Sequence, residues 1–516
     1  MGDCKVSAVL LDTVSIQKYI FSGRKLKEFV GASYIVNWIY DEPIKEVLNS
    51  LFPSKSIGLE CWENNPEKID ICNGDDFEVG YIGGGNALLF FKDEEKAKQF
   101  INKWTLNLLY MTPGLIPACA LINDFDFNNY QASIKRIFDR LEQVKTSFPV
   151  NVLIPRHGIS AECQLSGGAK EVWYNSVDPT ESGYISSILK TKLDFAETAN
   201  KKFEDDLIPD AYKTTLAFTT EIDKLGQKQG EENYIAIVHA DDNSTGKLFR
   251  SCNDLNATRK LSHFLKTKTK EAMCCTINDL IEEIKARSFD SFLNLSTFRN
   301  KTFLPIRPLI VGGDDITFVS HGKLGIWLAE RLIKNYQDLT GTNDFNHKFT
   351  LSAGVLIAKA HMPFYRAYRL AEDLCGQAKK KRRASSNSGN WLDFHIAYGG
   401  FTGTIEDIRR RYYRTPMGEL CLRPLKVGDR TPDSDSLETF IEATKTLSSI
   451  PRSKVMELRK VLAMGDQSAG KILVNNLSYR GQTLPPFPGG SYKQEIWVGG
   501  KTPYFDMIEL LEFYPI

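Results

Sequence analysis

The chain has 516 residues, and 65 Lys and Arg against 64 Asp and Glu leave a formal net charge of +1. This length corresponds to about three domains of roughly 150 residues each. A hydrophobic fraction of 42% with 25% charged residues excludes a disordered or fibrous protein. The balanced charge argues against nucleic-acid binding by bulk electrostatics and leaves open a local basic groove.

The hydrophobic runs are short. Ala8–Leu11 and Ala87–Phe91 fall far below the roughly 20 residues that a bilayer span needs. Met1–Val6 carries charged residues, and the apolar stretch behind it ends at Asp12, so no secretion signal is expected. We therefore expect a cytoplasmic protein without a membrane partner.

The ten cysteines are scattered, and no two stand in a C-x-x-C pair. His157 and Cys163 are two residues of the right kind for zinc, which takes four ligands in a structural site. We therefore expect no zinc.

An internal duplication is the main feature of the chain. Lys5–Asp12 and Tyr234–Asp241 are mostly apolar runs that end in an acid, and each is followed by glycines that enter a second apolar run. The spacing from Asp12 to Gly83 and from Asp241 to Gly312 is 71 residues in both copies (83 − 12 and 312 − 241). The same elements at the same spacing indicate a repeat even where few residues are identical.

Each glycine pair precedes a segment with helical periodicity and then a strand-like run. These are Glu94–Leu109 with Ile116–Ile122, and Lys323–Leu339 with Phe349–Ile357. The pattern predicts two βαββαβ units with mainly antiparallel sheets, an α+β fold of the ferredoxin-like type. The runs Tyr234–Ala240 and Leu309–Val311 alternate little, which predicts central strands that are buried on both faces.

Four regions follow from this reading. The first unit occupies residues 1–150 and ends in a helix over Tyr130–Val150, and residues 151–228 form a connector without a clear period. The second unit occupies 229–403, and helical periodicity in Ser436–Leu447 and Lys454–Met464 predicts an α-helical domain over 404–516.

The strongest chemical signal is Gly312-Gly313-Asp314-Asp315, which lies between two apolar runs. Glycines at a hairpin bend allow a bulky ligand to approach the backbone. Two adjacent carboxylates beside a core require positive charge, and a divalent cation bound through carboxylates and substrate phosphates supplies it. The alternative is a solvated hairpin whose acids face water.

Asp241 completes this candidate site, because the duplicated unit places it at the end of a neighbouring strand. The turn behind it contains Ser244, Thr245 and Gly246, whose backbone N–H groups could cradle a triphosphate. Lys379 lies on the helix that follows the last strand and can reach phosphates at the hairpin. The neighbouring basic residues Lys380–Arg383 fit equally well the C-terminal turn of a helix.

The first copy lacks the paired acids, since its bend is Gly83-Gly84-Gly85-Asn86. Asp12 alone cannot hold two metals, so this copy is predicted to do no metal chemistry. Ser15 and Ser33 lie in its polar turn and in a small-residue helix, where they are candidates for nucleotide binding. Plain helix packing is the alternative for Ser33.

These residues together resemble the large polymerase-cyclase subunit of type III CRISPR effector complexes. The resemblance rests on ordered motifs that run through nearly the whole chain: Ser15–Phe21, Lys25–Ser33, Gly83–Phe91, Ala240–Gly246, Gly312–Asp315, Ala371–Lys379 and Pro451–Gly465. It implies two palm domains related to GGDEF cyclases and polymerases, the second of which converts ATP into cyclic oligoadenylate. Carried over by position, Asp241, Asp314 and Asp315 are the ligands of Mg²⁺ or Mn²⁺, and Lys379 contacts phosphate.

The chain departs from the family pattern at three places. None of the seven histidines is followed by Asp, so we expect no HD-type DNA cleavage; the zinc-binding C-x-x-C is reduced to Cys163; and the usual second acid after the first strand is Asn243. These differences suggest a reduced relative, either an effector subunit without its nuclease or a stand-alone antiviral enzyme.

The resemblance also implies partners, namely other CRISPR effector subunits, guide and target RNA, and a downstream effector that the messenger activates. Two other functions remain open on the sequence: a non-catalytic scaffold of an RNA-guided complex, and a nucleotide-binding sensor.

Overall fold

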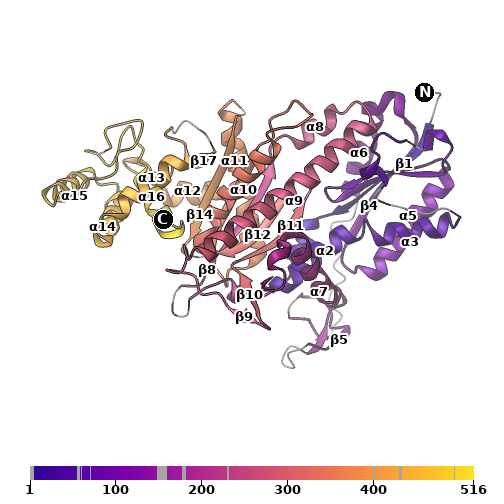
Figure 1. Ribbon diagram of the computed structural model, residues 1–516, viewed down its shortest axis with the longest axis horizontal. Helices are drawn as coiled ribbons and strands as arrows, with labels where there is room; N and C mark the ends of the chain where they lie inside the picture. The colour runs from indigo at the N-terminus through magenta and orange to yellow at the C-terminus, as the bar shows by residue number, and fades with distance from the viewer. Residues whose placement is uncertain are drawn as a thin grey trace. The chain divides into compact units, whose positions relative to one another are not determined.

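The structure is a computed structural model. It describes residues 5–54, 59, 61–69, 71–147, 160–164, 166–176, 182–228, 230, 232–386, 388–399, 403–428, 433–492 and 494–516. The chain divides into two compact units (Figure 1). Unit 1 contains Met1–Asp206, Ser244–Lys270 and Leu309–Asp314, and unit 2 contains Leu207–Asn243, Glu271–Pro308 and Asp315–Ile516. His157 of the zinc reading lies outside the described residues.

The first sheet has four antiparallel strands in the order β2-β3-β1-β4. The strands are β1 (Lys5–Val14), β2 (Phe77–Gly83), β3 (Asn86–Phe91) and β4 (Ile116–Asp126). The apolar residues of β1 lie at the centre of the unit, and Ala8, Val9, Leu10 and Leu11 are fully buried. The order is that of a βαββαβ unit, as the sequence predicts.

Unit 1 also contains helices, which alternate with these strands along the chain. They are α1 (Ile16–Phe21), α2 (Leu26–Trp38), α3 (Glu42–Leu51), α4 (Cys61–Asn64), η1 (Ile71–Asn73), α5 (Glu94–Met111), η2 (Phe127–Asn129) and α6 (Tyr130–Ser147). The region expected to be an aperiodic connector holds a short hairpin, β5 (Val172–Tyr174) and β6 (Gly183–Ile185), and the 21-residue helix α7 (Ser187–Leu207). The sequence analysis missed α7. Its buried Lys192 interrupts the apolar stripe, and the main chain at Lys192 packs so closely on α2 that a Cβ at Gly31 would meet its carbonyl at 1.8 Å.

The second sheet has six strands in the order β11-β12-β8-β13-β14-β17. They are β8 (Tyr234–Asp242), β11 (Ile306–Gly312), β12 (Asp315–His321), β13 (Leu351–Lys359), β14 (Asn390–Ala397) and β17 (Leu425–Val427). The first four repeat the order of the first sheet, in agreement with the predicted duplication. β14 pairs parallel to β13 and β17 antiparallel to β14.

One strand prediction is half wrong. β8 is central, with neighbours on both sides, but β11 stands at the edge of the sheet. Leu309 is nevertheless fully buried, and its carbonyl accepts a hydrogen bond from Ser33 Oγ. An edge strand that is covered by side chains has the same apolar sequence as a central one, so the sequence pattern could not separate the two.

Helices of unit 2 cover both faces of its sheet. On one face lies α10 (Gly325–Thr340), where a Cβ on Gly325 would meet the Cβ of Ala236 at 2.2 Å. On the other lies α11 (Phe364–Ala384), so close that a Cβ on Gly354 would meet the Ala371 carbonyl oxygen at 2.1 Å. Because side chains alternate along a strand, successive residues of β8 point to different helices.

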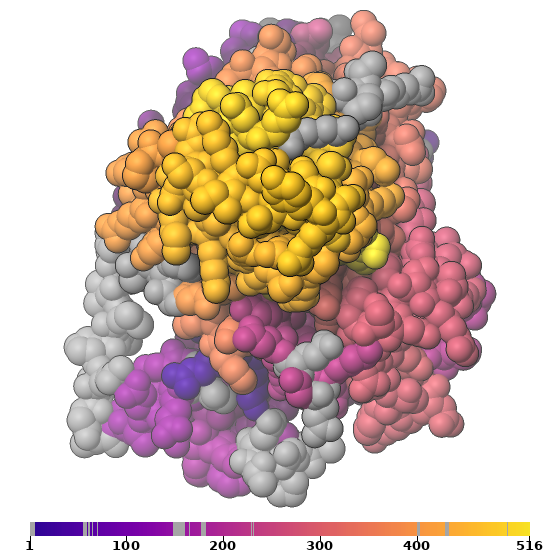
Figure 2. All heavy atoms as spheres, turned by 90° about the vertical axis from the view of Figure 1, so that its left-hand side faces the viewer, coloured from indigo at the N-terminus to yellow at the C-terminus, as the bar shows by residue number. Residues whose placement is uncertain are grey.

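The remaining elements complete the chain. They are η4 (Asp210–Tyr212), β7 (Leu216–Phe218), η5 (Ile222–Lys224), α8 (Thr245–Ser251), α9 (Leu255–Lys285), β9 (Thr297–Phe298), β10 (Lys301–Leu304), η6 (Gly322–Leu324), α12 (Ile405–Tyr412), β15 (Arg414–Thr415), β16 (Gly418–Glu419), α13 (Leu437–Ser448), α14 (Arg452–Met464), α15 (Gln467–Tyr479) and α16 (Tyr504–Phe513). In Figure 2 the atoms of the C-terminal region, in yellow, form one continuous patch on the face shown. Helices therefore form where the sequence predicts a helical tail, and among the described residues no helix is long and apolar enough to cross a membrane.

A buried group of charges ties α16 to the rest of unit 2. Arg423 and Asp506 have fully buried side chains, with Arg423 Nε 3.4 Å from Asp506 Oδ1, and Arg423 also forms an ion pair with Glu509. The main-chain N–H of Leu422 donates to Asp506 Oδ2 at 2.7 Å, and the Tyr413 hydroxyl donates to Glu509 Oε1 at 2.7 Å. Each buried carboxylate thus has a cation and a further donor, which its desolvation requires.

We predict that Arg423→Met lowers the unfolding free energy of unit 2 by about 3–5 kcal/mol, because two buried carboxylates lose their cation. Urea unfolding measures the difference. Arg414→Met is the matched control, since Arg414 pairs with Glu419 while both side chains are more than half exposed (64% and 53%). An equal loss in the two variants would contradict the buried role of Arg423.

A second prediction concerns pH. Burial, followed by the charges of Arg423 and Arg409, lowers the pKa of His395 from 6.5 to about 3. In the unfolded chain this histidine takes up a proton below its usual pKa, while in the folded state it stays neutral, so stability falls as pH falls. Between pH 7.5 and pH 5 this histidine should remove about 2 kcal/mol of unfolding free energy. In His395→Leu, the drop in unfolding free energy between pH 7.5 and pH 5 should be smaller than in the wild type by this amount. Urea unfolding at both pH values measures the two drops, and equal drops in the two proteins would refute the prediction.

Candidate active site

Two of the predicted acids lie opposite each other on neighbouring strands. β8 carries Asp241 near its end, β12 begins at Asp315, and the antiparallel register pairs these two residues directly. Their side chains are about one-third exposed, 31% for Asp241 and 32% for Asp315. Two carboxylates at one register position repel each other, so the arrangement depends on nearby positive charge.

Two cationic side chains supply this charge. Lys379 of α11 forms an ion pair with Asp241 Oδ2, and its Nζ lies 3.3 Å from the main-chain oxygen of Asp242. His239 lies two residues before Asp241 on β8, with Nδ1 3.2 Å from Asp315 Oδ1 and 3.2 Å from Thr317 Oγ1. Asp315 Oδ1 itself is buried and has no hydrogen bond of acceptable geometry. The His239 ring is therefore the charged partner of this buried carboxylate oxygen.

The pKa values follow from burial and these pairs. Burial raises the pKa of Asp241 above its usual value, and the Lys379 ammonium only partly opposes this effect. For His239, burial favours the neutral ring, but the charges of Asp315 and Asp241 outweigh it and raise the pKa. The charged form of His239 is thus stabilised by the acids it accompanies.

Asp242 and Asn243, which follow Asp241, have structural partners. Asp242 points to the opposite face of the sheet, where its Oδ2 accepts a hydrogen bond from the Tyr336 hydroxyl of α10 at 3.1 Å. The Asn243 amide donates to the carbonyl and hydroxyl of Thr350 at 3.0 Å and accepts from Ser352 Oγ at 2.6 Å. Asn243 therefore joins the ends of β8 and β13.

The donor set is of the kind that a hard divalent cation takes. Asp241 and Asp315 offer carboxylate oxygens from adjacent strands, and the buried Oδ1 of Asp315 is paired only with the His239 ring, at 3.2 Å. In the part of the chain that the structure describes, no group of three or more His, Cys, Asp or Glu side chains is arranged to hold a metal ion. The residue types therefore suit a divalent cation, but in this structure the acids are paired with Lys379 and His239.

The bend that carries the other predicted residues is shaped by glycine. Gly312 ends β11, and Gly313 has φ +62°, in the left-handed region. A Cβ at Gly313 would lie 3.1 Å from the Cα of Gly84, the glycine at the bend of the first copy, which also has φ +62°. The two glycine bends therefore touch backbone to backbone, and Asp314 follows at the turn before β12.

The residues after Asn243 begin a short helix. Ser244 precedes α8, and its carbonyl accepts hydrogen bonds from the N–H groups of Lys247 and Leu248 at 2.9 and 3.1 Å. Thr245 is buried, and a Cβ at Gly246 would meet no atom within 4 Å. A phosphate role for Ser244, Thr245 and Gly246 stays a prediction.

In the first copy, Ser15 is exposed and has φ 56°, at the start of α1. Ser33 is buried, and its hydroxyl is the group that donates to the Leu309 carbonyl. A nucleotide at Ser33 would have to replace this bond, so nucleotide binding by Ser15 and Ser33 also stays a prediction.

The sequence analysis missed an ion pair that the two copies share. Asp12 of β1 accepts from Lys145 of α6 at 2.8 Å, as Asp241 of β8 accepts from Lys379 of α11. The partners are separated by 133 residues in the first copy and 138 in the second. In the first copy the other oxygen of Asp12 accepts from the Thr13 N–H at 2.5 Å, so both oxygens are used. The nearly equal sequence separation of acid and lysine in the two copies is the signal from which this pair could have been predicted.

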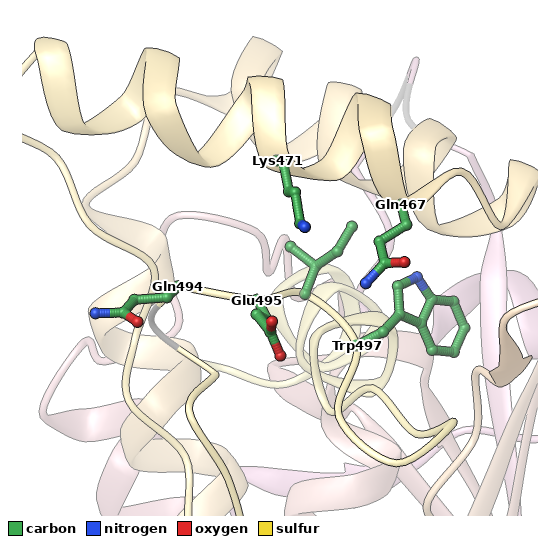
Figure 3. Close-up of a pocket in the computed structure, with 6 residues that line it drawn as sticks. Gln467, Lys471, Gln494, Glu495 and Trp497 are labelled. Carbon is green, nitrogen blue, oxygen red and sulfur yellow. The ribbon is translucent and has the colours of Figure 1, made fainter.

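The pocket drawn in Figure 3 lies elsewhere, between α15 and the segment that ends at Trp497. Gln467, Lys471, Gln494, Glu495, Ile496 and Trp497 line it. None of the predicted site residues lines this pocket. Because its lining contains one cationic and one anionic side chain, it shows no preference for a ligand of either charge.

Comparison with known proteins finds a family match within the second copy. Residues 234–387 match the family model for Cas10/Cmr2, second palm domain. This confirms the resemblance to the large subunit of type III CRISPR complexes on the segment that contains Asp241, the glycine bend and Lys379.

Solved structures with a similar fold span nearly the whole chain. The Csm1-Csm4 cassette in complex with pppApA is 14% identical, with a TM-score of 0.52 over 99% of this chain and 70% of that one. The cassette in complex with cA4 is 14% identical, with a TM-score of 0.50 over 99% and 70%. Csm1 of T. onnurineus is 15% identical, with a TM-score of 0.52 over 98% and 70%. At these identities the likeness concerns the fold.

A curated relative is similar over a shorter stretch. The proteasome-associated ATPase of Mycolicibacterium smegmatis is 27% identical over 168 residues, which are 32% of this chain. The chain spans about a quarter (26%) of the length of that relative. We draw no function from this match.

We predict that Gly313→Ala destabilises unit 1 by about 1–2 kcal/mol, because alanine is strained at a left-handed φ and its Cβ would press on Gly84. The adjacent Gly312→Ala is the control, since its Cβ would meet nothing within 4 Å and its φ is not left-handed. Thermal unfolding of both variants provides the measurement. If Gly312→Ala is the more damaging, the close contact of the two bends is not what requires glycine.

Proposed function

We propose that the chain is a nucleotidyltransferase that joins ATP into a cyclic oligoadenylate in antiviral defence, as a Cas10-like subunit of a type III CRISPR complex or as a stand-alone enzyme. The observation that carries the proposal is the opposition of Asp241 and Asp315 across β8 and β12, inside the segment that matches a Cas10/Cmr2 palm. The solved Csm1-Csm4 cassettes in complex with pppApA and cA4 support an adenylate ligand for this fold.

In this proposal the chain has two palm domains, 1–150 and 229–403, joined by the connector 151–228 and followed by the helical domain 404–516. The repeated strand order supports the two palms. Only the second palm would be catalytic, because Asp12 of the first has both oxygens satisfied by Lys145 and Thr13.

Asp241, Asp314 and Asp315 would hold Mg²⁺ or Mn²⁺, which supplies activation of a hydroxyl and neutralisation of phosphate charge when bound. The 3′- or 2′-hydroxyl of one nucleotide attacks the α-phosphorus of ATP, the new O–P bond forms, and pyrophosphate leaves with the electrons of the broken bond. Lys379, a point charge beside Asp241, would neutralise the phosphates. Ser244, Thr245, Gly246 and the open backbone at Gly312 and Gly313 would border the triphosphate, and Ser15 and Ser33 the second nucleotide.

His239 would contribute by holding Asp315. Its ring is buried and bridges Asp315 and Thr317, so it limits the rotation of the carboxylate. No pattern in the sequence predicts this role, because a histidine in an apolar strand is more often a core residue.

One observation favours the alternatives of a non-catalytic scaffold or a nucleotide sensor. Lys379 and His239 neutralise Asp241 and Asp315 without an external cation. A scaffold would retain such pairs for stability alone, whereas a sensor would bind a nucleotide without releasing pyrophosphate.

The test incubates the purified chain with labelled ATP and Mg²⁺ or Mn²⁺ and follows pyrophosphate and nucleotide products. Asp241→Asn and Asp314→Ala/Asp315→Ala should each lower turnover by at least about 100-fold, as expected when charge stabilisation of a transition state is lost. Lys379→Met should lower turnover by about tenfold or more, since one charge-assisted contact to phosphate is lost.

Asp12→Asn is the matched control, because it breaks the corresponding ion pair in the first palm and should retain turnover within about threefold. Equal product from the wild type and the double alanine variant would refute the catalytic assignment. ATP-dependent thermal stabilisation without pyrophosphate would identify a sensor. Co-purifying RNA and subunits without either response would identify a scaffold.

A further inference from the structure

The long helix α9 is anchored firmly near its start. Arg259 is fully buried, and its guanidinium donates to the carbonyls of Gly80 at 2.7 Å and Val79 at 2.6 Å. It also donates to Glu78 Oε1 at 2.7 Å and to the Lys68 carbonyl at 2.8 Å. A planar guanidinium with this many fixed acceptors holds α9 at one position and rotation against β2.

Further along the same helix, Thr269 meets the glycine bend. Thr269 is 1% exposed, and its Oγ1 donates to the main-chain carbonyl of Gly313 at 2.7 Å. This carbonyl belongs to the peptide that joins Gly313 to Asp314. Because Gly313 is in the left-handed region, where glycine has several accessible conformations, an outside donor is what selects the orientation of that peptide.

The hydroxyl of Thr269 differs from those of other buried helical threonines. Thr276, Thr340 and Thr444 each donate to the carbonyl four residues earlier in their own helix, at 2.8, 2.7 and 2.6 Å. That local bond is the usual partner of a threonine in a helix. Thr269 instead donates to a residue 44 positions away, at the bend that leads into the predicted catalytic acids.

We infer that Thr269 is a positioning residue for the acidic bend: its hydroxyl fixes the Gly313–Asp314 peptide and thereby the backbone from which Asp314 and Asp315 extend. The inference rests on the proposed function for its effect on turnover, and on the hydrogen bond alone for its effect on cation binding. Arg259 makes the device rigid, because it fixes the helix that carries the hydroxyl.

The experiment compares Thr269→Val, which keeps the shape and removes the donor, with Thr269→Ser, which keeps the donor. Turnover of ATP is measured with kcat and KM separated, and Mn²⁺ binding is measured on the protein alone by electron paramagnetic resonance. Thr444→Val is the control for loss of a buried helical hydroxyl, and thermal unfolding checks that all variants are folded.

Thr269→Val should lower kcat about tenfold, with KM for ATP within about twofold of the wild type, and should weaken Mn²⁺ binding about threefold. The losses are partial because the acidic side chains that bind the ion are misplaced and not removed. Thr269→Ser and Thr444→Val should stay within about twofold of the wild type in both measurements. Wild-type values for Thr269→Val, or an equal loss in Thr269→Ser, would overturn the inference. A wild type that binds Mn²⁺ but makes no product would refute the proposed function, while the Mn²⁺ comparison would still decide the role of Thr269.

Discussion

The opposition of two carboxylates across neighbouring strands is the constraint on which the site depends. Asp241 and Asp315 share one register position in a sheet whose other residues are largely buried, so their mutual repulsion is poorly screened. Two cationic side chains offset this repulsion: Lys379, from the helix on one face of the sheet, pairs with Asp241, and His239, from β8 itself, pairs with Asp315. A sheet of this kind is stable only with a cation beside the acids, whether that cation is a side chain or a bound ion.

Much of this arrangement could be predicted from the sequence. The equal spacing of Asp12 to Gly83 and Asp241 to Gly312 predicts the repeated unit, and the strand order β2-β3-β1-β4 recurs as β11-β12-β8-β13. The tight glycine bend predicts that the strands on its two sides pair, whereas the register that opposes Asp241 to Asp315 is set between β8 and β12. The prediction failed where tertiary contacts decide: β11 is an edge strand that Ser33 helps to cover, and α7 packs through its main chain and a buried lysine.

The two copies differ in what they have kept. Both have a glycine bend, and both have an acid at the end of the first strand that pairs with a lysine on the helix after the last strand. In the first copy both oxygens of that acid are satisfied by Lys145 and the Thr13 N–H, whereas in the second copy a further acid, Asp315, lies opposite it and pairs with His239. The acid–lysine pair is therefore common to the two copies, and the second acid at the opposing register position distinguishes the copy with predicted chemistry.

The helix α9 limits how this protein can change. Arg259 and Thr269 lie ten positions apart on one continuous helix, and each residue advances the helix by about 100°. Deleting or inserting a single residue between them would turn the hydroxyl away from the bend while leaving the guanidinium in place. The length of this stretch is therefore constrained, and a gap there in an aligned sequence would mark a chain that has lost the connection.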